Sequence, residues 1–282
     1  MNYRHAFHAG NFADVVKHAV LARIIAHLKE KPAAFRVIDT HAGAGVYDLA
    51  GPEAARTGEW REGIGKLMTA ELAPALRQLL SPYLDAVRAL NGDALKIYPG
   101  SPALMQCWLR PQDRLIACER EPTAARALAA RMRGDARVKA VEIDGYTALN
   151  AYVPPKERRG LVLIDPPFEQ PDEPDRIAEG VAAVHRKWPT GIYALWYPIK
   201  DARESASFAR RMARLGIARM LRAELTLPGK SDERLRGSGL ILVNPPWKLE
   251  GELGVLLPAL AAVLAGAAGQ GATRIGWLTG ET

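Results

Sequence analysis

Helical and strand-like patterns of apolar residues alternate along almost the whole chain. Seven short runs rich in leucine or β-branched residues, each bounded by glycine, proline or charge, predict strands. They span residues 36–39, 114–118, 138–143, 161–164, 191–197, 220–227 and 239–243. Helical periodicity fills the intervals, for example at residues 122–133 and 205–215. This alternation predicts an α/β fold built on a seven-stranded, mostly parallel sheet.

One interval interrupts the alternation. Roughly 65 residues separate Gly45 from the strand predicted at 114–118, far more than a crossover connection requires. Residues 53–91 carry leucines at helical spacing. We therefore predict a single domain over residues 1–282, with a helical insertion subdomain at about residues 48–97.

The composition is that of a folded protein and excludes a disordered chain. Of the 282 residues, 48% are hydrophobic and 24% are charged. The 38 Lys and Arg residues outnumber the 31 Asp and Glu residues, for a net charge of +7. This excess indicates an acidic partner, although by itself it points to nucleic acid only weakly.

Cysteine usage and apolar runs bear on location. Cys107 and Cys118 cannot form a disulfide framework, which favours a reducing compartment. No apolar stretch of a signal peptide follows Met1. The longest uncharged run, from Leu253 up to Arg274, contains Pro258 and several glycines. Its continuously apolar part is shorter than the ~20 residues of a spanning helix, so it predicts a buried core helix rather than a membrane span. We expect a cytoplasmic protein without membrane association.

A glycine turn after the first strand predicts a cofactor site. Asp39 ends that strand, and Gly43 and Gly45 follow. Glycines lack Cβ, so the backbone can turn tightly and approach a ligand closely. Asp48 stands where a dinucleotide fingerprint has its third glycine, and no phosphate-binding loop is present, which argues against NAD and ATP. An ordinary strand-to-loop turn remains the alternative interpretation.

Acidic residues close three successive strands. Asp39, Glu119 and Asp144 would all lie at the carboxyl edge of a parallel sheet, where ligands bind. Glu119 could accept hydrogen bonds from both hydroxyls of a ribose, and Asp144 from an adenine amine. Each acid could instead be only the N-cap of the next helix.

The fourth strand ends in Asp165-Pro166-Pro167-Phe168, which predicts chemistry on an aromatic amine. The prolines remove two backbone donors and stop the strand, so its last carbonyls remain available as acceptors. The Asp165 carboxylate and a neighbouring carbonyl could accept both hydrogens of the amine and orient its lone pair. Phe168 offers a flat face for a base. Asp165 could also take the proton, and the alternative is a rigid turn with a satisfied aspartate.

These features, in this order, resemble the RlmJ family of 23S ribosomal RNA adenine-N6 methyltransferases, within the amino-methyltransferases that use S-adenosyl-L-methionine. The resemblance covers essentially the whole chain. Its most specific stretches are residues 3–11, 39–45, 98–102, 164–168, 193–198 and 244–248. It implies a Rossmann-like class I methyltransferase fold, S-adenosyl-L-methionine as cofactor and N6 of an adenine in 23S ribosomal RNA as acceptor.

The resemblance also implies residue roles. Cofactor contacts are expected at His18, His41, Ser101, Glu119, Asp144 and Gly145, together with Gly43 and Gly45 of the glycine turn. Asp165 is expected to be the catalytic acceptor beside the cofactor, with Pro166 and Phe168 completing the catalytic motif. Substrate RNA is expected near Tyr3, Arg4 and Phe168. The wider motif often has tyrosine where this chain has Phe168, so stacking is retained and a hydroxyl contact is lost.

Local patterns around two of these residues are informative on their own. His18 shares a helix face with Leu21 and Ile25, in a helix that Asn11 is expected to cap. A buried, satisfied core histidine is the ordinary interpretation of such a position. Ser101 and Pro102 are predicted to be the N-cap and first residue of another helix.

A second motif, Asn244-Pro245-Pro246-Trp247, matches the amino-methyltransferase signature better in its letters. It follows the last predicted strand, which runs antiparallel in this fold class. Its end is therefore expected at the opposite edge of the sheet, and we predict that it is not catalytic.

Other classes of function compete with this interpretation. A metal-dependent hydrolase could use a mixed His and Asp cluster, namely His5, His8, Asp14, His18 and His41. It would leave Glu119, Asp144 and the Asp-Pro-Pro-Phe turn unexplained, so no metal is expected. A non-catalytic RNA-binding protein is another alternative, and a DNA adenine or a protein glutamine is an alternative acceptor.

Basic residues suggest where RNA would bind. Two runs stand out, Arg210, Arg211, Arg214, Arg219 and Arg222, and Lys156, Arg158 and Arg159. Such runs are usually solvated faces, so the stronger candidates are those nearer the cofactor edge, namely Tyr3, Arg4, His5, Arg56 and Arg61. The target adenine must be unpaired or flipped, and the insertion is expected to read RNA shape. We expect a monomer without an obligate protein partner.

Overall fold

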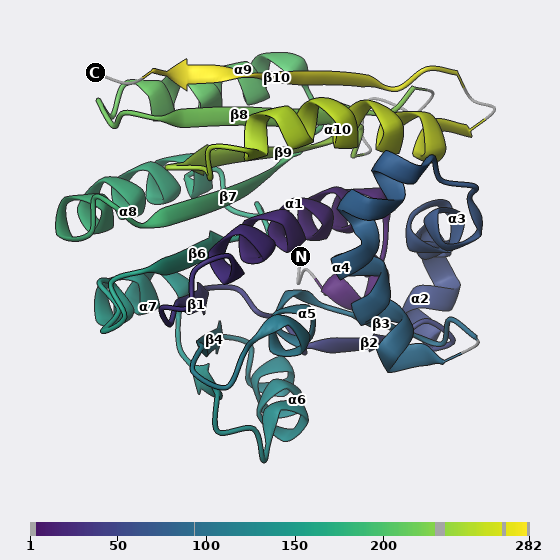
Figure 1. Cartoon of the computed structure of the whole chain (residues 1–282), viewed down its shortest axis with the longest axis horizontal. Coiled ribbons are helices and arrows are strands. Elements are labelled where there is room, and N and C mark those ends of the chain that lie inside the picture. The colour runs from purple at the N-terminus through teal and green to yellow at the C-terminus, as the bar shows by residue number, and fades with distance from the viewer. Residues whose placement is uncertain (1–3, 93, 229–234, 267–268, 281–282) are drawn as a thin grey trace.

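The computed structural model describes residues 4–92, 94–228, 235–266 and 269–280. Within these residues the main sheet has eight strands in the order β10-β8-β9-β7-β6-β1-β4-β5 (Figure 1). Their bounds are β1 Arg36–Asp39, β4 Arg114–Glu119, β5 Val138–Glu142, β6 Gly160–Ile164, β7 Ile192–Ile199, β8 Met220–Thr226, β9 Gly237–Val243 and β10 Ala272–Thr279.

Strand direction divides the sheet into two parts. The five strands β5, β4, β1, β6 and β7 are parallel neighbours. Strand β9 runs antiparallel to β7 and β8, and β10 runs antiparallel to β8. The carboxyl ends of the five parallel strands therefore share one edge, where α/β folds bind their ligands.

The α/β prediction is confirmed, but the strand number is wrong by one. All seven predicted strands form, and β10 is the eighth. The buried core helix predicted in the apolar part of the run at 253–274 is α10 (Leu249–Ala265), and the end of the run holds the first residues of β10. The strand escaped detection because it contains Gly276, follows a glycine-rich connection and pairs only with β8, so it lacks the apolar pattern of a central strand.

Helices cover both faces of the sheet. Neighbouring strand residues point to opposite faces: Val37 packs in the cluster with α1, α4, α5, α6 and α10, and Ile38 in the cluster with α7, α8 and α9. The first layer comprises α1 Phe12–Lys29, α4 Pro74–Asn91, α5 Ser101–Trp108, α6 Pro122–Met132 and α10. The second comprises α7 Gly145–Tyr152, α8 Glu173–Lys187 and α9 Ala202–Ala213.

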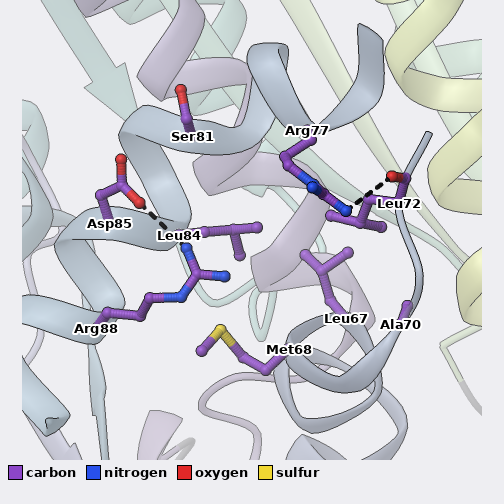
Figure 2. Close-up of a pocket in the computed structure, with 9 residues that line it drawn as sticks. All are labelled: Leu67, Met68, Ala70, Leu72, Arg77, Ser81, Leu84, Asp85 and Arg88. Atoms are coloured by element: carbon purple, nitrogen blue, oxygen red, sulfur yellow. Dashed lines mark hydrogen bonds and ion pairs between the residues drawn. The ribbon is translucent and has the colours of Figure 1, made fainter. Parts of the chain in front are cut away.

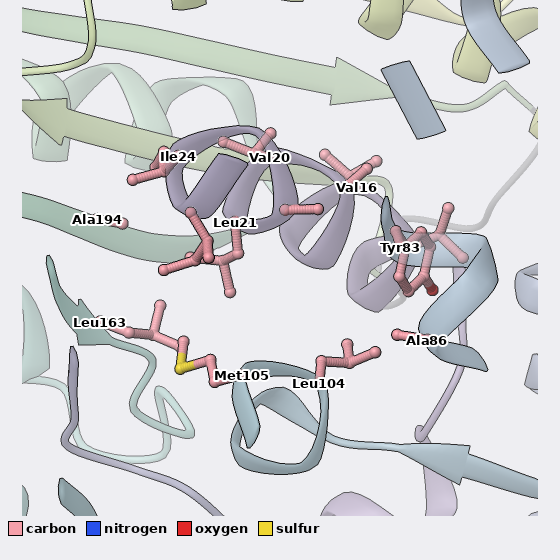
Figure 3. Packing of buried hydrophobic residues seen from close by; sticks show 14 of the residues in the cluster. Val16, Val20, Leu21, Ile24, Tyr83, Ala86, Leu104, Met105, Leu163 and Ala194 are labelled. Carbon is pink, nitrogen blue, oxygen red and sulfur yellow. The ribbon is translucent and has the colours of Figure 1, made fainter. Parts of the chain in front are cut away.

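Helix α1 is the centre of the first layer. Asn11 caps it as predicted, accepting hydrogen bonds from the backbone N–H groups of Ala13 and Asp14. Of its 18 residues 14 are buried, so it is packed on all sides. Figure 3 shows its apolar side chains between α5 and the sheet, where they meet Leu104, Met105, Leu163 and Ala194.

The segment predicted to be an insertion leaves and rejoins the domain at one point. Strands β2 (Val46–Asp48) and β3 (Ile97–Pro99) form an antiparallel ribbon in which Asp48 pairs with Ile97. The residues between them form α2 Pro52–Thr57, η2 Glu59–Glu62, α3 Ile64–Thr69 and α4, while the short η1 (His5–Phe7) precedes α1.

A cavity of about 380 Å³ lies between α3 and α4 (Figure 2). Leu67, Leu72 and Leu84 line it together with Arg77 and Arg88, and none of the predicted site residues does. Separately, no helix in the described part of the chain has both the length and the apolarity needed to cross a membrane.

Candidate cofactor and catalytic site

The glycine turn and the Asp-Pro-Pro-Phe turn leave adjacent strands at the same edge. Strand β1 pairs with β6 on one side and β4 on the other, with Asp39 opposite Leu163 and Ala117. Beyond β1 the chain stays anchored to both neighbours, because Thr40 N–H donates to the Leu163 carbonyl (3.1 Å) and Ala42 N–H to the Cys118 carbonyl (2.8 Å). Residue 165 directly follows β6, so the two turns are neighbours.

The glycine turn requires its glycines. Gly43 and Gly45 have φ of +63° and +85°, a region that residues with a Cβ rarely adopt. A Cβ at Gly43 would also collide with the hydroxyl of Tyr47, which accepts a hydrogen bond from Ala44 N–H (3.2 Å). Gly43 N–H donates to Glu119 Oε2 at 2.9 Å, which ties the turn to the end of β4.

Asp39 is fully buried and anchors helix α5. It accepts hydrogen bonds from the Ser101 hydroxyl (2.6 Å) and from His41 N–H (3.3 Å). Burial raises the pKa of Asp39 to about 7. The prediction that Ser101 is the N-cap of α5 is wrong by one residue: Gly100 is the N-cap and Ser101 begins the helix. The hydroxyl bonds to Asp39 instead of to the helix end.

His41 packs against the start of α7. Its Nδ1 lies 2.8 Å from the Thr40 hydroxyl, which donates to the Leu163 carbonyl. Burial lowers the pKa of His41 to about 4, so the ring is neutral at physiological pH. A Cβ at Gly145 would stand 2.6 Å from both His41 Cε1 and the Thr40 carbonyl oxygen, so only glycine fits there.

Asp144 is the N-cap of a helix, as its alternative interpretation predicted, and only one of its two oxygens serves this role. One carboxylate oxygen accepts from Tyr146 and Thr147 N–H (3.1 and 3.0 Å), which makes it the N-cap of α7. The other oxygen lies 3.8 Å from both Arg120 and Arg176 at the carboxyl edge. Glu119 is similarly divided between Gly43 N–H and Glu121 N–H.

Lys17 is the main site residue that the sequence interpretation missed. Its side chain is only 5% exposed, and its Nζ lies 2.6 Å from Asp165 Oδ2 and 2.8 Å from Asp14 Oδ1. Burial disfavours its charge, but the two carboxylates hold the pKa of Lys17 above its ordinary value. The available signal was a pair of opposite charges three residues apart in an otherwise apolar helix, because buried charges are nearly always paired.

The N-terminal segment continues this chain of polar contacts. His5 Nε2 lies 3.0 Å from Asp14 Oδ2, which also accepts from Gly10 N–H at 2.9 Å. The His5 ring is 5.0 Å from the ring of Tyr47, next to the glycine turn. Arg4 is mostly exposed and pairs with Glu53 at 3.6 Å. Tyr3, the other residue expected to contact RNA, lies outside the described residues.

A cluster of aromatic side chains lies near Asp165. Phe168 is partly buried, with φ of +51°, and its ring meets the rings of Trp196 and Phe208 edge-on at 5.9 and 6.3 Å. The Lys17 ammonium lies 5.9 Å from the Trp196 ring centroid. Trp196 therefore borders both Lys17 and Phe168, a role the sequence did not indicate.

His18 is buried, as its helical position predicted. Its Nδ1 lies 2.6 Å from the Tyr98 hydroxyl, which lies 2.9 Å from the Tyr83 hydroxyl. The other ring nitrogen, Nε2, is buried and has no hydrogen bond partner among the described residues. Because native structures rarely leave a buried polar atom unpaired, this nitrogen marks a place for a ligand or water.

The second Pro-Pro motif lies at the opposite edge, as predicted from strand direction. It follows β9, which is antiparallel to β7. The Asn244 side chain donates to the carbonyls of Pro189 (2.7 Å) and Gly191 (2.9 Å). Trp247 is 74% exposed. Asn244 thus holds a loop together at the edge away from the glycine turn.

The histidines proposed as metal ligands have other partners. His5 contacts Asp14, His8 lies 3.0 Å from Glu59, and His18 contacts Tyr98. In the described part of the chain, no group of three or more His, Cys, Asp or Glu side chains is arranged to hold a metal. The hydrolase alternative therefore has no supporting geometry.

Several members of the basic runs have structural partners. Arg222 is buried, Arg159 donates to the carbonyls of Leu28 and Ala33, and Arg211 pairs with Asp175. Arg210 and Arg214 are exposed on and just after α9. The runs are therefore not one continuous binding surface.

Topology and site together define the class of protein. Five parallel strands continued by antiparallel ones, a glycine turn after β1 and acids at the strand ends make this a Rossmann-like methyltransferase fold. The family described as RsmJ, "Ribosomal RNA large subunit methyltransferase D, RlmJ", matches residues 32–279, and the chain belongs to this family.

Individual relatives agree over the full length. The chain is 40% identical to "Ribosomal RNA large subunit methyltransferase J" of Escherichia coli and 37% identical to the protein of the same name from Haemophilus influenzae, each over 100% of both chains. Among solved structures, a Legionella pneumophila protein aligns with a TM-score of 0.88 and 34% identity, over 95% of this chain and 98% of that one.

Proposed function

We propose that the protein transfers the methyl group of S-adenosyl-L-methionine to N6 of an adenine in 23S ribosomal RNA. The observation that carries this proposal is the adjacency of the glycine turn, tied to Glu119, and Asp165, held by Lys17, at one edge of the sheet. The names of its full-length relatives support large-subunit ribosomal RNA as the substrate.

The residues at this edge fit S-adenosyl-L-methionine. Glu119 is the acceptor for the ribose hydroxyls, and Asp144 for the adenine amine. Gly43, Gly45 and Gly145 leave room where a Cβ would intrude, and the unpaired Nε2 of His18 supplies a further polar contact. The other proposed contacts with the cofactor are His41, Ser101 and Asp165. When bound, the cofactor supplies an electrophilic methyl group on a sulfonium.

The protein's own contribution is to orient the acceptor amine. Lys17 engages Oδ2 of Asp165, and Oδ1 has no hydrogen bond partner in the described part of the chain. We assign Oδ1 and the neighbouring backbone carbonyl to the two amine hydrogens, which directs the nitrogen lone pair at the methyl group. Pro166 and Pro167 present no N–H that would compete for these acceptors. Phe168 stacks on the base, and Asp165 accepts the proton that the amine releases.

The substrate RNA reaches this site from the side of the N-terminal segment. Tyr3 and Arg4 are proposed to contact it, and the helices between β2 and β3 to read its shape. The adenine enters unpaired or flipped. We further propose that residues 1–282 form one catalytic domain with the insertion at about 48–97, acting as a monomer in the cytoplasm, where ribosomal RNA is found.

Methyl transfer tests the proposal directly. The purified protein is incubated with tritiated S-adenosyl-L-methionine and 23S ribosomal RNA from a strain that lacks the corresponding gene, and the product is digested to nucleosides for mass spectrometry. We expect radioactive N6-methyladenosine. Label only in cytidine or in protein would refute the base assignment, and no transfer from a protein that binds the cofactor would refute the substrate.

A further inference from the structure

The hydrogen bonds around His18 determine which of its ring nitrogens carries the proton. His18 from α1, Tyr98 from β3 and Tyr83 from α4 form a buried chain: Nδ1 to the Tyr98 hydroxyl at 2.6 Å, and that hydroxyl to the Tyr83 hydroxyl at 2.9 Å. Tyr83 and Tyr98 are 0% exposed and His18 is 1% exposed. The two phenol hydroxyls are therefore not hydrogen-bonded to surface solvent.

All three groups are neutral. Burial lowers the pKa of His18 well below its ordinary value, and burial raises the pKa of Tyr83 and of Tyr98 above theirs. The chain therefore contains three hydrogens for bonding: one on each phenol and one on the imidazole.

One arrangement uses both phenolic hydrogens. Tyr83 donates to Tyr98, and Tyr98 donates to Nδ1 of His18, so the imidazole hydrogen is on Nε2. In the reverse arrangement Nδ1–H donates to Tyr98 and Tyr98 donates to Tyr83, which leaves the Tyr83 hydrogen without an acceptor. The described residues offer that hydroxyl no other partner, and Figure 3 shows the Tyr83 ring among apolar side chains, near Val16 and Ala86. Each arrangement leaves one hydrogen without an acceptor among the described residues: Nε2–H of His18 in the first and the Tyr83 hydroxyl in the second. The first is favoured because a ligand or an ordered water at Nε2 can accept the imidazole hydrogen, whereas the apolar side chains around Tyr83 offer no acceptor.

His41 makes the opposite arrangement. The Thr40 hydroxyl donates its single hydrogen to the Leu163 carbonyl (2.9 Å), so His41 Nδ1 must donate to Thr40 at 2.8 Å. The hydrogen of the neutral ring is then on Nδ1, and Nε2 is an acceptor. At Nε2, His18 is therefore a hydrogen bond donor and His41 an acceptor.

His18 is within electrostatic range of Asp14, Lys17 and His5, the polar cluster that reaches Asp165. His18 follows Lys17, which reaches Asp165. Tyr98 pairs across the ribbon with Tyr47, whose hydroxyl bonds to the glycine turn. The methyl group must come close to Asp165, so the part of the cofactor on this side is the amino-acid end attached to the sulfonium, and its carboxylate accepts hydrogen bonds.

We propose that Tyr83 and Tyr98 are positioning residues that fix His18 in the Nε2–H tautomer, so that His18 donates to the carboxylate of the bound cofactor. This inference rests on the proposed function for the identity of the ligand, but the tautomer is a property of the free protein. It also makes α4, a helix between β2 and β3, part of the support of the cofactor site.

The tautomers are measured by two-bond ¹H–¹⁵N correlation spectra of the full-length protein labelled in histidine. We expect His18 as Nε2–H and His41 as Nδ1–H in the same spectrum. An Nδ1–H signal for His18 would overturn the proposal without any variant having to fold. Adding S-adenosylhomocysteine should shift the His18 Nε2–H resonance, and an unchanged resonance in a protein saturated with this ligand would overturn the carboxylate contact.

Variants then test the positioning role. Tyr98→Phe removes the donor to Nδ1, so we expect the Nε2–H tautomer to lose its dominance and the Kd for S-adenosylhomocysteine to rise about tenfold. Tyr83→Phe leaves the Tyr98 donor in place and should raise that Kd only about twofold. Tyr193→Phe is the matched control, because Tyr193 is equally buried but donates to backbone carbonyls in the other core. It should change neither the tautomer nor the Kd.

The identity of the contact is tested with a second probe and a second background. Methylthioadenosine lacks the amino-acid end, so Tyr98→Phe should not weaken its binding; an equal loss for both probes would overturn the carboxylate assignment. His18→Gln places an amide donor near the position of Nε2, and in that background Tyr98→Phe should have no further effect. If the wild-type tautomer is as expected but S-adenosylhomocysteine does not bind at all, the proposed function fails and the tautomer assignment stands.

Discussion

Two turns of nearly the same sequence differ in everything that surrounds them. Asp165-Pro166-Pro167-Phe168 and Asn244-Pro245-Pro246-Trp247 both follow buried strands of one sheet. Asp165 meets a buried ammonium, whereas Asn244 meets two backbone carbonyls. The first aromatic packs against Trp196 and the second is exposed to solvent. Letters alone do not separate them, but strand direction does.

The difference lies in how each turn satisfies its polar groups. The Asn244 contacts are ordinary loop closure that stabilises the fold. The Asp165 side brings Asp14, Lys17 and Asp39 together in or near the core. Burying charges is costly even when they are paired, so this arrangement is better explained by chemistry than by stability. Exchanging residues at each turn should therefore separate activity from stability.

The largest effect is expected for Asp165→Asn. The amide keeps the shape of the side chain but has only one oxygen, so it cannot accept hydrogen bonds from both Lys17 and the substrate amine. We therefore expect kcat for methyl transfer to fall about 1000-fold. The Kd for S-adenosylhomocysteine should change less than about threefold, because Asp165 is one of many proposed cofactor contacts and the glycine turn, Glu119 and Asp144 are untouched. Tritium transfer and calorimetry measure the two quantities. A variant with near-normal kcat would show that the catalytic turn has been misassigned.

Lys17→Met should have the next largest effect. It leaves Asp14 and Asp165 without the cation between them, so we expect about 100-fold slower methyl transfer and a loss of several kcal/mol in the free energy of unfolding. Arg23→Met is the matched control: Arg23 is on the same helix and pairs with Glu252 at 2.8 Å, away from Asp165. It should lower stability while sparing kcat. Equal losses of activity in both variants would mean that Lys17 is only structural.

Exchanging the two aromatic residues sharpens the comparison. Phe168→Leu removes a flat surface while keeping bulk, so we expect kcat/KM for RNA to fall about tenfold, the size of one lost stacking contact. Trp247→Leu at the equivalent position of the other turn should leave it unchanged. Methylation rates at limiting RNA concentration measure both. A larger loss for Trp247→Leu would make that exposed residue the RNA contact.

Asp39 predicts how the stability of this edge depends on pH. Its pKa of about 7 exceeds that of an unfolded aspartate, so between about pH 4 and 7 the folded state holds a proton that the unfolded state has lost. Its contribution to the free energy of unfolding is complete below pH 4 and falls by about 1 kcal/mol per pH unit through this window. Asp39→Asn removes this slope.

Urea unfolding at pH 5, 6, 7 and 8 checks the sign. The stability of Asp39→Asn relative to the wild type should rise from pH 5 to pH 7 and level off by pH 8. Kinetic effects should be small beside those at Asp165, because the amide oxygen can still accept from Ser101. A difference that stays flat from pH 5 to pH 8 would show that Asp39 is ionised throughout.

Sequence patterns predicted much of this architecture because the central strands are buried on both faces and read as short apolar runs. Gly43 and Gly45 could be recognised from their place after the first strand, whereas Gly145 was indicated only by the family resemblance. Positive φ or a close neighbour excludes a side chain at each of the three. Strand β10 was missed because edge strands escape that constraint. The predicted N-cap of α5 is one residue from the observed one because the Ser101 hydroxyl bonds to Asp39, 62 positions away, instead of to the helix end.

The missed site residues share one physical reason. Lys17, Trp196 and Tyr98 act through contacts with residues far from them in the chain, 148 positions apart for Lys17 and Asp165. The apolar periodicity of a sequence shows which face of a helix or strand is buried, but not which residues of other elements contact that face. Charged residues in an apolar helix signal that partners exist, and only the three-dimensional fold identifies a distant one such as Asp165.

The smallest effect on activity is expected for Asn244→Ala. It removes hydrogen bonds to the carbonyls of Pro189 and Gly191 and places alanine at φ of +51°, so we expect a loss of about 2 kcal/mol in stability with kcat within twofold of wild type. Asn244→Gly separates the two causes, because glycine adopts this φ without strain. It should recover about 1 kcal/mol of the loss seen with alanine. If Asn244→Ala instead abolished methyl transfer in a protein as stable as wild type, the second turn would be the catalytic one, since no structural cause would remain for the defect.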